Sequence, residues 1–240
     1  MRVIKTTDEL QSLLDNGVVR INDNCCIECD VPFSGVGEYI VGIEINGNLS
    51  CLSLSYSGYL ACTSLFCGGN LYCGSNLVCD SNLRCEGNVI CEGPYMFVRG
   101  YVRCCGDVFC KGNLQCNVDL NCLSSLFCGE RLQCCGDIVC EGDLICKGDF
   151  YCQGNLSCKS NVVVNGVFFW SHSSKPCIDG GFFYRLVKPP AWQDDDAYRW
   201  LATEQWMSSG SALCELPVWA SELESSSVKK LELQRSKAVN

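Results

Sequence analysis

Cysteine is the residue in this chain whose number and spacing could do chemistry. The sequence holds 24 cysteines among 240 residues, and most recur at every sixth position, as in CGDIVCEGDLICKGDFYCQGNLSC over 135–158. Thiols can form disulfides, bind a soft metal ion such as zinc, or act as nucleophiles once ionised. Each role requires sulfur atoms that converge or that meet a basic partner, so the elements that carry the cysteines decide between the roles.

The six-residue spacing runs in two registers that are offset by one residue. The first register runs from Cys67 to Cys91 and the second from Cys104 to Cys158. An apolar residue stands two positions before each of these cysteines. Because residues two apart in a strand point to the same side, each cysteine shares a face with a larger apolar side chain. The offset predicts a single-residue insertion in a corner near Pro94.

Turn-forming dipeptides, usually Gly-Asn or Gly-Asp, separate the apolar-x-Cys units. We expect these residues to tolerate positive φ and to bond their own backbone, so that each unit of six is one short strand and one corner. A helix is excluded because glycine with asparagine at every sixth position would destroy it. Three sides then close a coil of about 18 residues, which predicts an all-β fold, a parallel β-helix of triangular cross-section.

This fold assigns the cysteines to packing. The inward corner of a narrow prism has room for a small apolar side chain beside a large one, and a free thiol is such a side chain. A ladder of thiols rarely meets the torsion of a disulfide, and a metal store needs nitrogen or sulfur partners that converge. We expect free thiols, no metal and no cofactor, with Cys105 and Cys135 pointing outward. The lone C-x-x-C motif at Cys26 and Cys29 would send its thiols to opposite faces of a strand.

Composition excludes several classes of partner. The net charge of −9 argues against binding to nucleic acid or to an anionic membrane. The N-terminal residues lack the apolar core of a signal peptide, and no apolar run reaches membrane-spanning length. We therefore expect a cytoplasmic protein whose thiols stay reduced.

Four parts follow from these patterns. They are a helical N-terminal cap (1–17), irregular first coils (18–66), a regular cysteine-rich β-helix (67–170) and a C-terminal extension (171–240).

Helices are expected at both ends of the solenoid. A capping box that begins at Thr6, followed by an apolar stripe and then Gly17, predicts a helix over 6–16. Acidic residues before an apolar pattern predict a second helix over 194–209, and a last helix is expected over 221–237. Such caps would cover the exposed strand edges.

One outer face of the solenoid is expected to be apolar along its length. The residue between the apolar position and the cysteine points outward, and on one side it forms the column Tyr72, Ile90, Phe109, Phe127, Ile145 and Val163. A bare stripe of this kind is a liability on a monomer. We expect a second copy in a homodimer or another protein partner to cover it. The alternative is docking of the chain's own aromatic C-terminal segment, which carries Trp200 and Trp206.

The order Gly-Asp-aliphatic-x-small, as in GDIVC and GDLIC, resembles the repeats of bactofilins and related polymer-forming domains. The resemblance covers residues 65–170 and is one of pattern. It implies a right-handed triangular β-helix, in preference to a left-handed one, and a role as a structural scaffold.

An enzymatic alternative depends on one residue. Acyltransferases built from six-residue repeats are left-handed trimers that use a histidine as general base, and His172 is the single histidine of the chain. Its serine-rich surroundings look like an ordinary polar loop. We therefore predict a non-enzymatic scaffold or protein-interaction module and keep the trimeric acyltransferase as the alternative.

Overall fold

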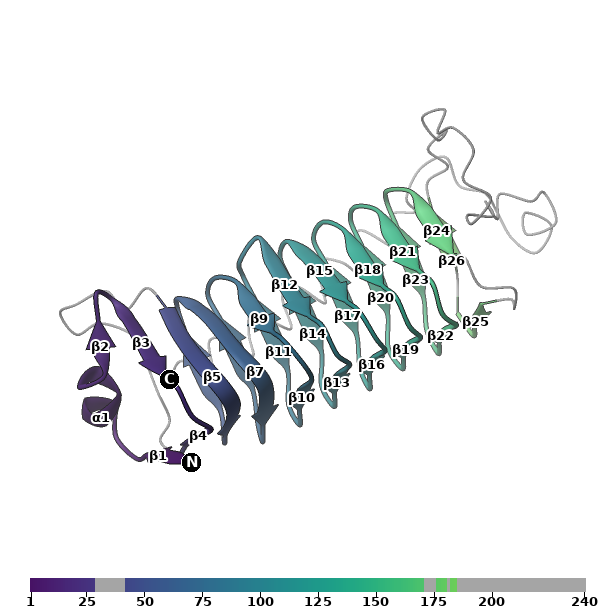
Figure 1. Ribbon diagram of the computed structural model, residues 1–240. Coiled ribbons are helices and arrows are strands. Elements are labelled where there is room, and N and C mark those ends of the chain that lie inside the picture. The colour runs from purple at the N-terminus through teal and green to yellow at the C-terminus, as the bar shows by residue number, and fades with distance from the viewer. Residues whose placement is uncertain (29–41, 171–175, 181, 185–240) are drawn as a thin grey trace.

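The computed structural model describes residues 1–28, 42–170, 176–180 and 182–184, which form a parallel β-solenoid with one short helix (Figure 1). Strands of successive coils stack in register, so that Leu83 lies beside Leu65, 18 residues earlier. The spacing becomes 19 where Met96 pairs with Leu77. The predicted fold class and coil length are thus confirmed, and the inserted residue lies in the corner before Met96, as expected.

Each coil has three sides, and each side is a column of parallel strands. The first face consists of β10 (Leu83–Cys85), β13 (Val102–Cys104), β16 (Leu120–Cys122), β19 (Ile138–Cys140), β22 (Leu156–Cys158) and β25 (Cys177–Ile178). The second face consists of β9 (Leu77–Cys79), β12 (Tyr95–Val98), β15 (Asn113–Cys116), β18 (Leu132–Cys134), β21 (Phe150–Cys152) and β24 (Phe168–Trp170).

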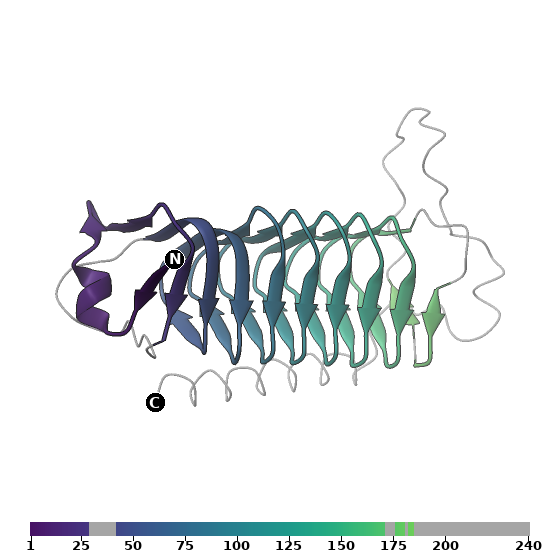
Figure 2. The same ribbon diagram turned by 60° about the horizontal axis from the view of Figure 1, so that its bottom comes forward.

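The third face is a separate eight-stranded sheet. It consists of β6 (Leu54–Tyr56), β8 (Leu71–Cys73), β11 (Val89–Cys91), β14 (Val108–Cys110), β17 (Leu126–Cys128), β20 (Leu144–Cys146), β23 (Val162–Val164) and β26 (Phe182–Tyr184). The coils follow one another along a single axis from the N-terminal to the C-terminal end (Figures 1 and 2).

Two long strands join the first and second faces near the N-terminal end. β7 (Tyr59–Cys67) pairs with β9 through its first half and with β10 through its second half. β5 (Gly42–Cys51) likewise pairs with β3 (Val18–Ile21) and then with β4 (Cys25–Ile27), and β4 pairs with β1 (Arg2–Ile4). These irregular early coils agree with the strand character that the sequence has before residue 66.

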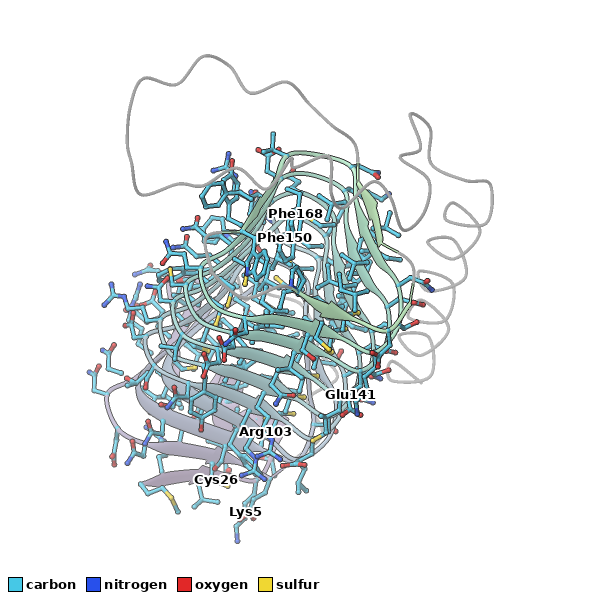
Figure 3. All side chains as sticks on the ribbon, turned by 90° about the vertical axis from the view of Figure 1, so that its right-hand side faces the viewer. Lys5, Cys26, Arg103, Glu141, Phe150 and Phe168 are labelled. Atoms are coloured by element: carbon cyan, nitrogen blue, oxygen red, sulfur yellow. The ribbon has the colours of Figure 1, made fainter. Side chains whose placement is uncertain are left out.

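The core is the interior of the coil. The apolar residue and the cysteine of each unit are buried, from Leu71 and Cys73 to Leu156 and Cys158. Near the C-terminal end, Phe150 and Phe168 stack inside the coil with ring centroids 5.1 Å apart (Figure 3). In each strand, the residue between the apolar position and the cysteine points away from the core. These residues give the solenoid three outward columns of side chains.

The corner glycines are required by close stacking, and the expected reason, positive φ, is wrong. Among the described residues, positive φ occurs at Asn16 and Gly17 and at no corner of the regular coils. A Cβ added to Gly154 would lie 2.4 Å from the carbonyl carbon of Gly136, one coil earlier. The absence of a side chain therefore lets the backbones of successive coils approach closely.

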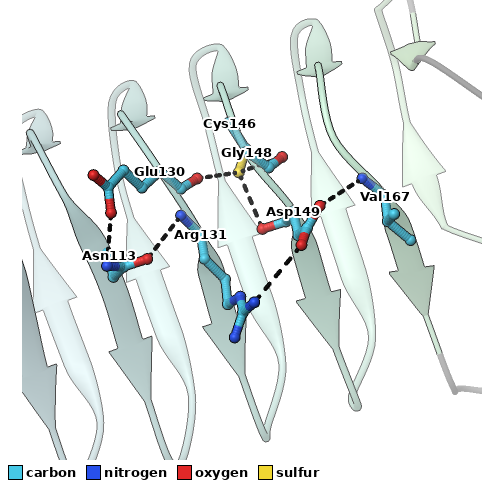
Figure 4. A network of polar contacts seen from close by, with 7 residues as sticks. All are labelled: Asn113, Glu130, Arg131, Cys146, Gly148, Asp149 and Val167. Carbon is cyan, nitrogen blue, oxygen red and sulfur yellow. Dashed lines mark hydrogen bonds and ion pairs between the residues drawn. The ribbon is translucent and has the colours of Figure 1, made fainter. Parts of the chain in front are cut away.

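The corner Asn and Asp side chains bond the next coil, whereas we expected bonds to their own backbone. Asp137 accepts hydrogen bonds from the backbone N–H of Asn155, at 2.6 Å, and from its side-chain amide. In Figure 4, Asp149 accepts from the N–H of Val167, and Asn113 accepts from the N–H of Arg131. These bonds tie successive corners together along the rod.

The N-terminal helix is shorter than the sequence predicts. α1 (Thr7–Gln11) begins at the predicted capping box, in which Thr6 and Glu9 bond each other's backbone N–H, and Leu10 is buried in the core. Gly17 does not end the helix. Asn16 and Gly17, both at positive φ, instead form the two-residue turn of an antiparallel hairpin between β2 (Leu14–Asp15) and β3. The predicted helices over 194–209 and 221–237 lie outside the described residues, and the handedness of the coil stays a prediction.

Replacing Gly154 by alanine tests the stacking explanation. The new Cβ overlaps the backbone of Gly136, so we expect the free energy of unfolding to fall by about 1–3 kcal/mol. Gly68 is the matched control, because a Cβ there would meet its nearest neighbour at 3.6 Å, an ordinary contact. Denaturant unfolding followed by circular dichroism should separate the two variants. Equal loss of stability in Gly154→Ala and Gly68→Ala would contradict the explanation.

Candidate interaction surface

The thiols of the regular coils point into the solenoid and bond backbone carbonyls. In Figure 4, the Sγ of Cys146 lies 3.4 Å from the carbonyl oxygens of Gly148 and Asp149 in its own corner, and 3.2 Å from that of Glu130 in the preceding coil. The same arrangement recurs at Cys134, Cys140 and several other positions. Each thiol is thus an apolar filler that also donates weakly to the corner.

This environment suppresses thiol chemistry. All 22 cysteines of the described residues are free, and burial raises the pKa of Cys73 and of Cys152 to about 12. Cys73 and Cys152 are therefore neutral at physiological pH, whereas the thiolate is the nucleophile and the metal ligand. Between neighbouring coils, a hydrogen bond from one thiol to the next lowers the pKa of Cys116 and raises that of Cys134. Within the described ranges, no group of three His, Cys, Asp or Glu side chains converges to hold a metal ion. The packing role predicted for the repeat cysteines is confirmed.

Cys105 and Cys135 do point outward, as predicted. Both are half-buried, and the Sγ of Cys105 lies 3.2 Å from a carboxylate oxygen of Glu86. This hydrogen bond is the main cause of the raised pKa of Cys105, while Arg103 and Arg84 lower it more weakly. The same bond and the ion pair with Arg84 hold the pKa of Glu86 below its usual range. The cluster therefore keeps its exposed thiol in the protonated form.

The six residues of the predicted apolar column do form one column on the third face. Ile90 pairs with Tyr72 and with Phe109, and the pairing continues through Phe127, Ile145 and Val163 at one residue per coil. We call this set the third-face ladder. Each member is the central residue of its strand, so its side chain points away from the coil while its neighbours point inward.

The third-face ladder is more deeply buried than the other outward columns. Phe127, Ile145 and Val163 are only 3–4 % exposed and form a small apolar cluster of their own, separate from the core. Residues of the same type at the same strand position on the other two faces, Phe97 and Val139, are half-buried. Phe169, at the C-terminal end of the second face, is an exception at 6 % exposed, and Tyr72 and Phe109 of the ladder are half-buried.

Aromatic and charged contacts organise the ladder. The rings of Phe109 and Phe127 stack with centroids 4.8 Å apart and planes 6° from parallel. The ammonium of Lys147 lies 5.5 Å from the centre of the Phe127 ring, within the range of a cation–π contact. At the N-terminal end, the hydroxyl of Tyr72 donates to Glu92 at 2.9 Å. The ladder is thus an apolar stripe with charged groups along one edge.

The other columns are more polar. Arg84 and Arg103 are exposed on the first face, and Gln115, Gln133 and Tyr151 are half-buried on the second. Phe66 is the rung before Arg84, with the guanidinium 5.5 Å from its ring centre.

Two contacts between residues of successive coils were not predicted from the sequence. The first involves Phe66, which we did not include because the regular repeat begins one residue later. The second involves the cluster of Glu86, Cys105 and Arg84. It could have been found by following the residue after each cysteine through successive coils, since Glu86 and Cys105 are 19 residues apart across the insertion.

Several predicted site residues lie outside the described residues. They are His172, Trp200, Trp206 and the second cysteine of the C-x-x-C motif, Cys29. The described part of the chain contains no helix long and apolar enough to cross a lipid bilayer.

Comparisons with protein families, with curated proteins and with solved structures found no match to this chain.

Alkylation of the native protein tests the assignment of the thiols. We expect a maleimide to modify Cys105, Cys135 and Cys177, whereas Cys128 and Cys146 should react only after unfolding, because they are fully buried. Peptide mapping by mass spectrometry reads the positions. Modification of Cys128 in the folded protein at the rate of Cys135 would contradict the assignment.

Replacing Glu86 by glutamine tests the cluster at Cys105. Loss of the carboxylate removes the main cause of the raised pKa, so more Cys105 is ionised at pH 7.5 and its alkylation should accelerate. Glu141→Gln is the control, because Glu141 pairs with Lys159 on the same face, 2.6 Å away. An alkylation rate of Cys105 that is unchanged in Glu86→Gln, or raised equally in Glu141→Gln, would contradict this explanation.

Proposed function

We propose that this protein is a non-enzymatic scaffold, a rigid β-solenoid that associates with a second copy of itself through the third-face ladder. The observation that carries the proposal is the ladder itself, in which six apolar side chains occupy one position in consecutive coils and point away from the core. An apolar stripe of this length marks an interaction site.

The chemistry of the described residues supports a structural role. The residue type most able to react, cysteine, points into the coil along most of the solenoid, where its thiol is buried and bonded to carbonyls. The repeat pattern that resembles bactofilins fits the same role, as does a reducing, cytoplasmic location in which the thiols stay free.

The ladder suits contact between two copies. A two-fold interface brings the same patch of both subunits together, so the patch must complement itself. Phe109 and Phe127 are stacked with their faces toward each other, and the ladder from Phe109 to Val163 contains no carboxylate. Since the chain carries a net charge of −9, a ladder without acidic side chains limits repulsion between copies.

Sedimentation of the full chain over a range of concentrations tests the proposal. We expect reversible association of the natural chain, and its loss when Phe109 and Phe127 are both replaced by lysine, because two charges would then be buried in the contact. Gln115→Lys with Gln133→Lys is the matched control, at the same strand position on the second face. This control should associate like the natural chain.

Three outcomes would overturn the proposal. They are the absence of association at every concentration, association that survives the lysines on the ladder, and equal loss in the control variant. A trimer that survives the changes on the ladder would instead favour the acyltransferase alternative.

A further inference from the structure

The burial of the third-face ladder requires a cover that the coils themselves do not supply. Ladder side chains point away from the core, yet Ile145 and Val163 are each 3 % exposed. Val139, on the first face, has the same orientation and is half-buried. Whatever covers the ladder is apolar and lies along several coils, because Ile90, Phe127, Ile145 and Val163 are buried, while Phe109 between them is half-buried.

The path of the chain brings a candidate to this face. The last described strand, β26, belongs to the third face, where its Phe183 pairs with Val163 at the C-terminal end of the ladder. Residues 185–240 follow from that point. The described residues therefore end beside the surface that is covered.

The last predicted helix has the length of the ladder. The 17 residues of 221–237 would span about 26 Å as a helix. From Tyr72 to Val163 the ladder takes five steps between coils, about 24 Å. Leu223, Val228 and Leu231 would lie on one side of such a helix.

The charges of this segment match the edge of the ladder in one direction only. Along that edge, the charged residues that directly follow a third-face strand are Glu92 near the N-terminal end and Lys111, then Lys147, farther on, while Gly129 and Glu130 follow the strand between the two lysines. The segment begins with Glu222 and Glu224. Its second half carries one acid, Glu232, and four basic residues: Lys229, Lys230, Arg235 and Lys237. A helix that runs back from the C-terminal end places acids beside the lysines and bases beside Glu92.

We infer that residues 221–237 form an amphipathic helix that covers the third-face ladder of the same chain and thereby competes with self-association. The inference rests on the proposed function only for the competition, since the docking itself is argued from burial, length and charge. The segment and a second copy bind the same six residues, so association requires release of the segment.

Zero-length carbodiimide crosslinking of the full chain tests the docking. This reagent joins an amine to a carboxylate in direct contact, and the monomer fraction is isolated before peptide mapping. We expect links from Lys111 or Lys147 to Glu222 or Glu224. Links from these lysines to Glu204, or links that occur only in dimers, would assign the cover to another segment or to a second copy and would overturn the inference.

Variants in the segment test the competition without altering the solenoid. Leu223→Lys with Leu231→Lys should release the segment, increase binding of an apolar fluorescent dye, and lower the concentration at which half the chain is dimeric by about tenfold or more. Ser225→Lys with Ser236→Lys adds the same charge on the opposite side of the helix and should change neither quantity.

The two proposals fail in different ways. If crosslinks form and the leucine variant binds more dye but stays monomeric at every concentration, the docking stands and the proposed function fails. If the natural chain associates through Phe109 and Phe127 while the leucine variant behaves like its control, the proposed function stands and the docking is wrong.

Discussion

The contact on which the structure depends is the close stacking of each corner on the corner of the preceding coil. At these corners a backbone N–H donates to the carbonyl one coil away, as from Gly154 to Gly136 at 3.1 Å. A Cβ at Gly154 would overlap that backbone. Side-chain oxygens of Asn and Asp then accept the next N–H, so the corner is bonded both by its backbone and by its side chains. Regular strands of three residues are stable because the corners set their register.

The cysteines follow from the same constraint. The inner side of each corner presents carbonyl oxygens that already accept a backbone N–H, beside a space too narrow for a second large side chain. A thiol fills this space and adds a weak, shared hydrogen bond, as Cys146 does. An alanine would leave the carbonyls without this donor. The packing role also limits the reactivity of these cysteines, because their thiols are shielded from solvent, and burial raises the pKa of Cys152.

Stacking in register converts a six-residue pattern into continuous stripes on the surface. One outward residue per strand, repeated every coil, gives a column with a single character along much of the rod. On the third face this character is apolar, whereas Arg84 and Arg103 mark the first face as solvated. A solenoid built in this way can give each face a different surface, because its interior is filled by packing residues. In the proposed competition between the segment 221–237 and a second copy, the third-face ladder would be free to associate only after the segment is released.

From the sequence alone we could predict the strand positions of the regular coils, the coil length, the inserted residue before Met96, the inward thiols and the membership of the third-face ladder. All of these depend on the spacing of two within a strand and of about 18 between coils, which are properties of local geometry. Only the tertiary structure decided why glycine occupies the corners, what the corner Asn and Asp side chains bond, and that Gly17 turns a hairpin. Each of these depends on how close a second segment of chain comes, and that distance is not encoded in any one stretch of residues.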